Sequence, residues 1–213
     1  MAENLLWFVM GLYLAAWLLA LAGSIFKRPA LHKYCHAAGL AGLLVQSYVL
    51  ISRWVGIGHP PLFGTFENTQ AGAWVLVLFT MILAIFYPRL KFSGIATYIW
   101  AVVLMGFGMI FNQNRIPLTI SEQSLWVDLH VIFAWLAFGS FFMAWGIALR
   151  FLRKKPMADN WVQDRMLQFL LFGFVTYTVM ILLGSVYEFF LFGKWWQWDI
   201  VETISLVTWL YYG

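Results

Sequence analysis

Cysteine and charge are the two features that this sequence has least of. Of 213 residues, Cys35 is the one cysteine, and 10% of the residues are charged. A single cysteine excludes an internal disulfide framework and a C-x-x-C-H motif for covalent haem attachment. The low charge, together with 63% hydrophobic residues and a mean hydropathy of +0.81, excludes an ordinary soluble domain. The sequence therefore predicts an integral membrane protein.

Long apolar runs recur along the chain, and each has about the 20 residues that an α-helix needs to cross a hydrocarbon core of about 30 Å. Lipid offers the backbone no hydrogen-bond partner, so helices are expected. We predict an all-α, polytopic membrane helix bundle with about six full transmembrane helices and the start of a seventh. No linker separates the spans, so residues 1–213 form one predicted transmembrane domain. The spans lie at about 4–26, 36–52, 70–87, 92–111, 127–152 and 166–187, and the seventh begins near Glu202.

Lys and Arg are distributed unevenly over the connections between these spans. With the N-terminus outside, ten of the 13 basic residues lie on the cytoplasmic side and three lie outside. The positive-inside rule favours this orientation, which also explains the net charge of +4 without a nucleic-acid partner. The inner residues are Lys27, Arg28, Lys33, Arg89, Lys91, Arg150, Arg153, Lys154, Lys155 and Arg165, and the outer ones are Arg53, Arg115 and Lys194.

Three tryptophans and an acidic residue crowd the short connection before the seventh span. Tryptophan often anchors a protein at the membrane interface, and each of these indoles could be such an anchor. Their density is better explained by a flat aromatic platform for a large planar ligand, with haem as the first candidate. Asp199 could cap the seventh helix, and Glu202 would suit its positive N-terminal end. The residues of the platform are Trp195, Trp196, Trp198 and Asp199.

Two histidines are predicted on the same outer side. His130, near the outer end of the fifth span, could hydrogen-bond a neighbouring helix or bind haem iron, and its level beside the tryptophans favours the ligand role. His59 lies in a loop rich in Gly and Pro, where a solvated side chain is the simpler interpretation. On the inner side His32 and His36 flank Cys35, but three such residues without a fourth ligand are a weak metal motif.

Residues 192–212 resemble the tryptophan-rich WWD signature of the haem-handling proteins of cytochrome c maturation. Within this stretch, Trp-Asp at 198–199 and Thr-Trp-Leu at 208–210 are most similar to the CcsA branch, also called ResC, rather than to CcmC or CcmF. The segment 58–67 resembles the G-[HR]-x-P…Y-E segment of that branch. Leu-His-Val at 129–131 is similar to its first external histidine.

The resemblance implies a multi-spanning protein that presents haem b on its outer, periplasmic or extracytoplasmic face. The haem vinyl groups would then accept the two thiols of a C-x-x-C-H motif in apocytochrome c, as part of a holocytochrome c synthase. It also implies a CcsB- or ResB-like membrane partner, in a bacterial-type cytoplasmic membrane or a thylakoid membrane. His130 would be an axial ligand of the haem iron, and the other predicted haem contacts are His59, Gly193, Trp195, Trp196, Trp198 and Asp199.

The sequence departs from the signature at two points. Phe192 stands in place of its first tryptophan and lacks an indole N–H. From Glu202 to Gly213 there are 12 residues, about 18 Å of helix, which is shorter than the hydrocarbon core. Relatives continue into a further span and a second external histidine. We therefore expect another segment or chain to supply both, or else an offshoot of the family without synthase chemistry.

Two other functions fit the same residues. The chain could be a family-derived membrane subunit of an electron-transfer complex that binds haem or quinone without forming thioethers. It could also be a scaffold or transport subunit in which the tryptophans are only anchors. If haem binds, the candidates for pairing with its propionates are the outer basic residues Arg53, Arg115 and Lys194.

Overall fold

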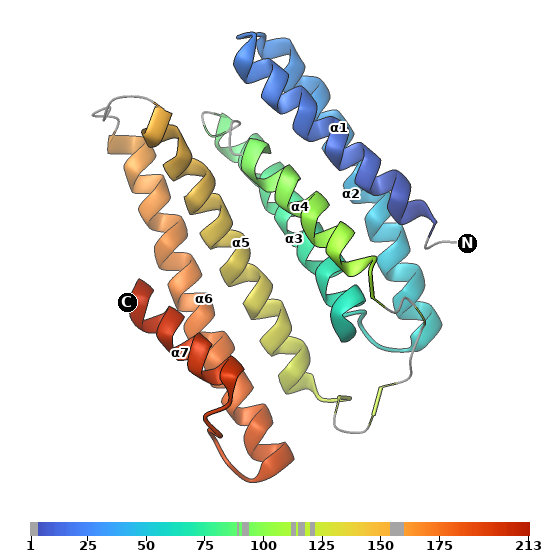
Figure 1. The fold of residues 1–213 in the computed structure, drawn as a ribbon, viewed down its shortest axis with the longest axis vertical. Coiled ribbons are helices and arrows are strands. Elements are labelled where there is room, and N and C mark those ends of the chain that lie inside the picture. The colour runs from blue at the N-terminus through green and yellow to red at the C-terminus, as the bar shows by residue number, and fades with distance from the viewer. Residues whose placement is uncertain are drawn as a thin grey trace.

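The computed structural model describes residues 4–88, 90, 94–111, 114, 118–119, 122–153 and 160–213. Throughout these residues the regular structure is helical, with seven α-helices and no strand, which confirms the predicted all-α bundle (Figure 1). The helices are α1 (Leu5–Ile25), α2 (Pro29–Ile57), α3 (Gly64–Phe86), α4 (Gly94–Gly108), α5 (Leu125–Arg153), α6 (Asn160–Phe192) and α7 (Ile200–Tyr212).

Five of the described helices, α1, α2, α3, α5 and α6, are long and apolar enough to cross a membrane. The chain is thus a multi-pass membrane protein. Four of these helices, α2, α3, α5 and α6, are longer than the predicted spans, and the difference is largest for α2 with 29 residues and α6 with 33. Hydropathy marks only the part of a helix that lies in lipid, whereas backbone hydrogen bonds continue past it. α2 begins seven residues earlier than predicted, at Pro29, because proline suits the first turn of a helix.

The fourth predicted span, 92–111, is shorter in the structure. α4 has 15 residues, so five full-length spans rather than about six are found in the described part of the chain. Gly108 brings the end of α4 against Thr69 of α3, so closely that a Cβ at position 108 would clash. Beyond it the backbone tightens, because Ile110 N–H donates to the carbonyl of Phe107, three residues back.

α1 to α4 share one hydrophobic core, and a chain of polar side chains crosses it. The hydroxyl of Tyr13 in α1 donates to Oε1 of Gln46 in α2 at 2.6 Å. Gln46 Nε2 donates to the carbonyl of Gln70 in α3, and Gln70 Nε2 donates to the carbonyl of Met105 in α4. Each of these bonds joins different helices in an apolar environment, so the network fixes how the four helices are placed.

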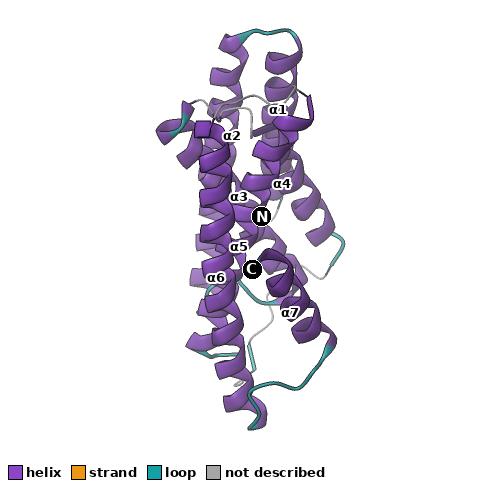
Figure 2. Ribbon diagram, turned by 90° about the vertical axis from the view of Figure 1, so that its left-hand side faces the viewer, coloured by secondary structure: helices purple, strands orange, loops and turns teal. Residues whose placement is uncertain are grey.

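α5 and α6 form a long antiparallel pair beside this four-helix unit, and α7 lies along α6 (Figures 1 and 2). Two smaller cores hold this part together. One joins α3, α5 and α6 through residues such as Leu83, Met143 and Val162. The other joins α5 and α6, with Trp209 of α7 packed against Tyr177 and its neighbours.

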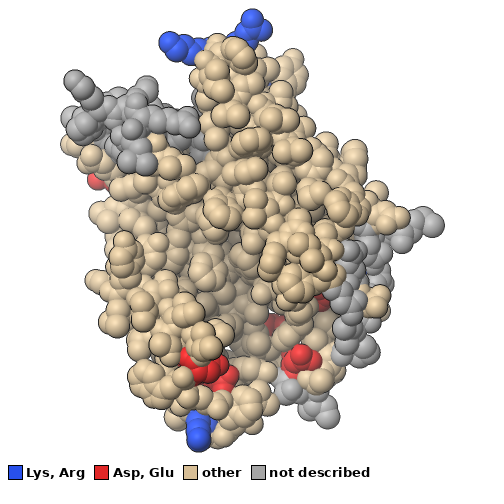
Figure 3. Space-filling view, viewed as in Figure 1, with Lys and Arg blue, Asp and Glu red and all other residues tan. Residues whose placement is uncertain are grey.

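Charged side chains separate toward the two ends of the bundle. In the view of Figure 3, most of the visible Lys and Arg atoms lie at the end that carries the α1–α2 connection, while a smaller basic patch shares the opposite end with most of the acidic side chains. We call the first the basic end, after the exposed Lys27, Arg28 and Lys33, and the second the tryptophan end, after residues 193–199. Which end faces the cytoplasm stays a prediction. Arg89, Lys91, Lys154 and Lys155 lie outside the described residues, as do the side chains of Arg150 and Arg153.

Candidate functional site

His130 lies in the second turn of α5, and its ring is bonded to α6. Its Nδ1 is 2.8 Å from the backbone carbonyl oxygen of Met180. A carbonyl oxygen only accepts, so Nδ1 carries the proton and Nε2 keeps its lone pair in the neutral ring. Imidazoles that bind metals are held in this way, because the outer hydrogen bond fixes both tautomer and ring orientation. The predicted alternatives of helix contact and metal ligand are therefore compatible, since the two nitrogens can serve one each.

A glycine on α6 makes this contact possible. A Cβ built on Gly184 would lie 2.9 Å from Nδ1 of His130, closer than side chains normally pack. Gly173, eleven residues earlier and therefore about three turns along the same face, receives Phe141 of α5 in the same manner. The stripe of small residues on α6 thus brings α5 close enough for a direct imidazole–carbonyl bond.

Four aromatic rings connect the His130 side of α5 with the tryptophan connection. Trp126, one turn before His130 on α5, stacks on Phe190 of α6 at 6.3 Å between ring centroids. Phe190 contacts Phe189 edge to face, and Phe189 stacks on Trp195 at 4.4 Å. Among the predicted platform residues, Trp195 is therefore connected by ring contacts to Trp126, on the turn of α5 that precedes His130.

The backbone of the tryptophan connection turns at two positions with positive φ. Gly193 has φ +70° and ends α6, with its N–H donating to the carbonyl of Phe189. A Cβ there would meet no atom within 4 Å, so glycine is favoured by conformation rather than by space. Trp198 has φ +62°, which is unusual for a residue with a large side chain and costs free energy.

Asp199 and Glu202 organise the end of this connection as a reciprocal cap of α7. Oδ1 of Asp199 accepts from Glu202 N–H at 2.7 Å, and the Glu202 carboxylate accepts from the Asp199 N–H. The predicted capping role of Asp199 is confirmed. Glu202 Oε2 also accepts from the N–H of Gln197, whose side chain donates to Glu188 of α6. These carboxylates therefore fix the conformation of the tryptophan connection through hydrogen bonds.

The indoles themselves face outward. Trp198 is 70% exposed and Trp195 is 56% exposed, while Trp196 is half-buried and contacts Trp198 edge to face at 6.0 Å. Nε1 of Trp196 is buried without a hydrogen-bond partner. A buried N–H without an acceptor is costly, so this position suits a ligand that brings one. The structure thus has exposed aromatic faces and an unused donor at the tryptophan end.

The basic residues predicted to pair with haem propionates differ in burial and in their neighbours. Arg53 is 1% exposed, and its Nη2 lies 2.8 Å from Oε1 of Glu67 in a buried ion pair between α2 and α3. The prediction for Arg53 is therefore wrong, because a buried guanidinium keeps a carboxylate beside it. Arg115 lies outside the described residues. Lys194 is exposed directly beside the tryptophans and remains the candidate.

His59 lies at the tryptophan end but on another side of α5. Its Nδ1 is 2.9 Å from the carbonyl oxygen of Pro60, and its Nε2 is buried without a partner. The imidazole is close enough to Glu122 and Asp128 to interact with both electrostatically. Asp128 and His130 are two residues apart on α5, hence about 200° around the helix. His59 is thus near the face of α5 opposite to the one that bonds α6.

Glu122 adds negative charge to the surroundings of His59. Its carboxylate accepts from the hydroxyl of Thr119 at 2.7 Å and from the Thr119 N–H at 2.8 Å. These hydrogen bonds lower the pKa of Glu122 below its usual range, so the side chain is ionised at neutral pH.

At the basic end, the weak metal motif around Cys35 does not form a site. Cys35 is fully buried in the core of α1 to α4, and His32 packs against Gly23 of α1. Within the described ranges, no group of three or more His, Cys, Asp and Glu side chains is placed to hold a metal ion.

Comparisons with known proteins point to one family. Residues 62–213 match the family described as "Cytochrome C assembly protein". The "Cytochrome c biogenesis protein CcsA" of Chlorella vulgaris is 28% identical over 207 residues, covering 76% of this chain and 65% of the relative. The proteins of the same name from Chlamydomonas reinhardtii and Prochlorococcus marinus (strain MIT 9312) are 26% and 23% identical, covering 82% and 90% of this chain and 54% and 73% of the relatives. The chain thus spans less than two thirds of the length of the two algal relatives. The family match includes His130 and the tryptophan connection, whereas His59 lies before it.

Proposed function

Because this chain belongs to the cytochrome c assembly protein family, we propose that it handles haem at the tryptophan end of the bundle during cytochrome c biogenesis. The observation that carries the proposal is the bond from His130 Nδ1 to the carbonyl of Met180, which leaves Nε2 to bind the haem iron. Haem is here the substrate that the protein holds and passes on.

The residues of the tryptophan connection suit the other parts of a haem. The exposed faces of Trp195 and Trp198 can pack on the porphyrin ring, which is flat and apolar. The unpartnered N–H of Trp196 and the ammonium of Lys194 can meet the propionates. Asp199 acts by capping α7 and so fixes the indoles, since a carboxylate would repel a propionate.

The chemistry of attachment would come from haem b itself, whose vinyl groups take up the two thiols of a C-x-x-C-H motif in apocytochrome c. This chain would hold and orient the ring at the tryptophan end, facing the periplasm or another extracytoplasmic space, in a bacterial-type cytoplasmic or a thylakoid membrane. A CcsB-like membrane partner and a segment with a second histidine would complete the assembly. The names of the relatives support this proposal.

The first experiment tests the ligand. We expect the purified protein, supplied with haem, to show a Soret band that is lost or shifted in His130→Ala. His36→Ala is the matched control, because His36 lies in a helix at the basic end. Since His59 lies near the other face of α5, His59→Ala should reduce haem retention less than His130→Ala does. An unchanged Soret band in His130→Ala would refute the ligand assignment.

The second experiment tests the attachment. The chain is co-expressed with a C-x-x-C-H apocytochrome and the proposed membrane partner, and covalent haem is followed by haem staining of denatured protein. Covalent haem that requires both this chain and His130 supports the proposal. Reversible redox of bound haem without any covalent product would instead indicate an electron-transfer subunit.

A further inference from the structure

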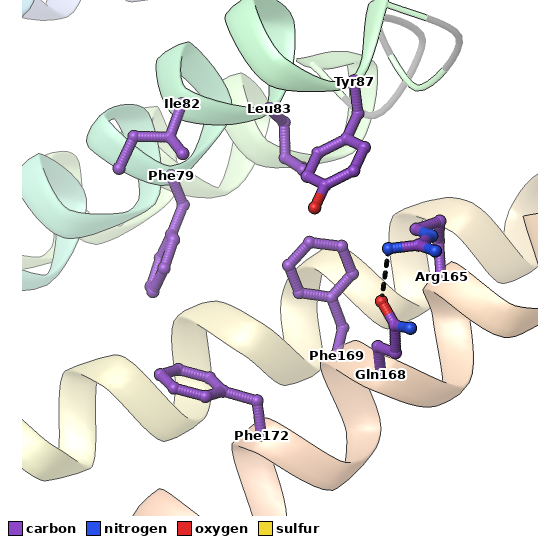
Figure 4. A pocket seen from close by; sticks show the side chains of 8 residues that line it. All are labelled: Phe79, Ile82, Leu83, Tyr87, Arg165, Gln168, Phe169 and Phe172. Carbon is purple, nitrogen blue, oxygen red and sulfur yellow. Dashed lines mark hydrogen bonds between the residues drawn. The ribbon is translucent and has the colours of Figure 1, made fainter.

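Two hollows adjoin along the side of α3 that faces α5 and α6. The one nearer the basic end has a volume of about 270 Å³ and lies between α3 and α6, with Phe79, Tyr87, Arg165 and Phe172 among its walls (Figure 4). The other has a volume of about 650 Å³ and lies among α2, α3 and α5. Phe79 and Ile82 line both, so the two hollows meet at these two side chains, and we call them together the groove.

The wall of the larger hollow is almost entirely apolar. The N–H of Trp74 donates to the hydroxyl of Ser47 at 2.7 Å, and the N–H of Trp135 donates to Oδ1 of Asn68 at 2.6 Å. These two wall indoles therefore present only apolar surface. From Tyr87 to Ala71 the two hollows follow 16 residues of α3, about 24 Å, which is more than half of a hydrocarbon core of about 30 Å. This length is sufficient for an acyl chain of one leaflet.

The positively charged side chain of Arg165 lies at the basic end of the groove. The guanidinium of Arg165 lies over the rings of Tyr87 and Trp161, at 5.5 and 5.6 Å from their centroids. Its Nη1 donates to Oε1 of Gln168, a neutral amide, while its Nε is buried without a hydrogen-bond partner (Figure 4). A buried donor on a charged group is costly to leave unsatisfied, and an anionic oxygen is the acceptor that suits it best.

We propose that this groove binds an anionic phospholipid, with the phosphate at Arg165 and one acyl chain along α3 over Phe79 and Ile82. Haem would also bring anionic and apolar parts. However, among the described residues that line the two hollows none is a histidine, cysteine or methionine, so the common axial ligands of haem iron are absent there and Tyr87 is the one lining side chain that could take that role. The Arg165 end of the groove lies at the basic end of the bundle, away from His130, and the proposal does not depend on the proposed function.

The headgroup contact is tested by native mass spectrometry of the full chain, released from detergent with phosphatidylglycerol or phosphatidylcholine. We expect phosphatidylglycerol to bind more tightly, and Arg165→Gln to weaken it by about tenfold while phosphatidylcholine is unaffected. Arg28→Gln is the matched control, because Arg28 is an exposed arginine at the same end. Equal binding of the two lipids, or an Arg165→Gln protein that binds phosphatidylglycerol as the parent does, would overturn the proposal.

The acyl-chain contact is tested by filling the groove. Ile82→Trp, which places a large ring where the hollows meet, should reduce retention of phosphatidylglycerol severalfold with Arg165 intact. Ile85→Trp is the control, because Ile85 is 70% exposed on the same helix and lines neither hollow. Equal retention in the two variants would contradict the proposal, as would displacement of the lipid by stoichiometric haem. Each variant is first checked for a parent-like helical circular dichroism spectrum and elution volume.

Discussion

At the scale of single residues, the structure explains how one histidine can serve both as a helix contact and as a metal ligand. His130 uses Nδ1 to bond the carbonyl of Met180, and the missing side chain of Gly184 gives the ring its place on α6. Neither partner could be identified from the sequence, because they lie about 50 residues away on another helix. The one available signal was the spacing of Gly173 and Gly184, which puts both on one face of α6.

The first prediction concerns Gly184. Gly184→Ala would place a Cβ 2.9 Å from Nδ1 of His130, so the ring must shift and its bond to Met180 should weaken. We expect the stability to fall by about 1–3 kcal/mol, as in other overpacked sites, and the Soret band of the haem-loaded protein to shift or decrease. Gly11→Ala is the control, because a Cβ at Gly11 meets no atom within 4 Å and should be tolerated.

The second prediction distinguishes two possible roles of Asp199, which are to cap α7 and to supply a negative charge to the site. Asp199→Ala removes the cap of α7 and should cost about 1 kcal/mol, whereas asparagine caps almost as well as aspartate. We therefore expect Asp199→Ala to lose haem and to speed amide exchange over residues 193–204, while Asp199→Asn resembles the parent in both measurements. Equal loss of haem in the two variants would mean that the negative charge itself is required.

At the scale of the elements, a buried ion pair ties the tryptophan end of α2 to the start of α3. Arg53 and Glu67 enclose the connection that carries His59, and the guanidinium also lies 4.9 Å from the centroid of the Phe66 ring. The sequence predicted an outer, accessible Arg53. It could not show the pairing, because burial depends on how the α2–α3 hairpin closes. The ion pair therefore belongs to the scaffold that positions this connection.

The third prediction concerns that ion pair. Glu67→Gln leaves the Arg53 charge buried without its carboxylate, so we expect the free energy of unfolding in detergent to fall by about 3 kcal/mol or more. The double variant Arg53→Met, Glu67→Leu should recover most of this loss, since it leaves neither charge buried. A double variant as unstable as Glu67→Gln would show that packing of the side chains, rather than charge, is what matters there.

At the scale of the whole molecule, charge and aromatic residues make the two ends of the bundle different. Lys27, Arg28 and Lys33 are exposed at one end, and the tryptophan connection with Lys194 is exposed at the other. The excess of basic residues predicts that the first end faces the cytoplasm. A haem site at the tryptophan end would then face the opposite compartment, where the proposed acceptor would meet it.

The fourth prediction tests this orientation. In a Cys35→Ala background, which removes the one native thiol, cysteine is placed at the exposed positions by Lys194→Cys or Arg28→Cys. A membrane-impermeant maleimide added to intact cells should label the first variant, and the second only after the membrane is permeabilised. The reverse pattern would place the tryptophan end in the cytoplasm and would contradict an extracytoplasmic haem site.

The sequence by itself determined the membrane class, the positions of the seven helices and the cap of α7. These properties depend on local hydropathy and on neighbouring residues, so they can be inferred without knowing the packing. Helix lengths were harder to predict from the sequence. α2 and α6 continue past their apolar parts, and α4 ends earlier than predicted, where Gly108 meets α3.

Only the tertiary structure decided which predicted site residues come together. His130 faces α6, and Trp126, one turn before it on α5, is connected through aromatic rings to Trp195. His59 lies near the other face of α5, and Arg53 is held by Glu67. The groove with Arg165 likewise arises between α3 and α6, which are far apart in the sequence. The physical reason is that helix packing, which sets the rotation and spacing of neighbouring helices, determines what each side chain can reach.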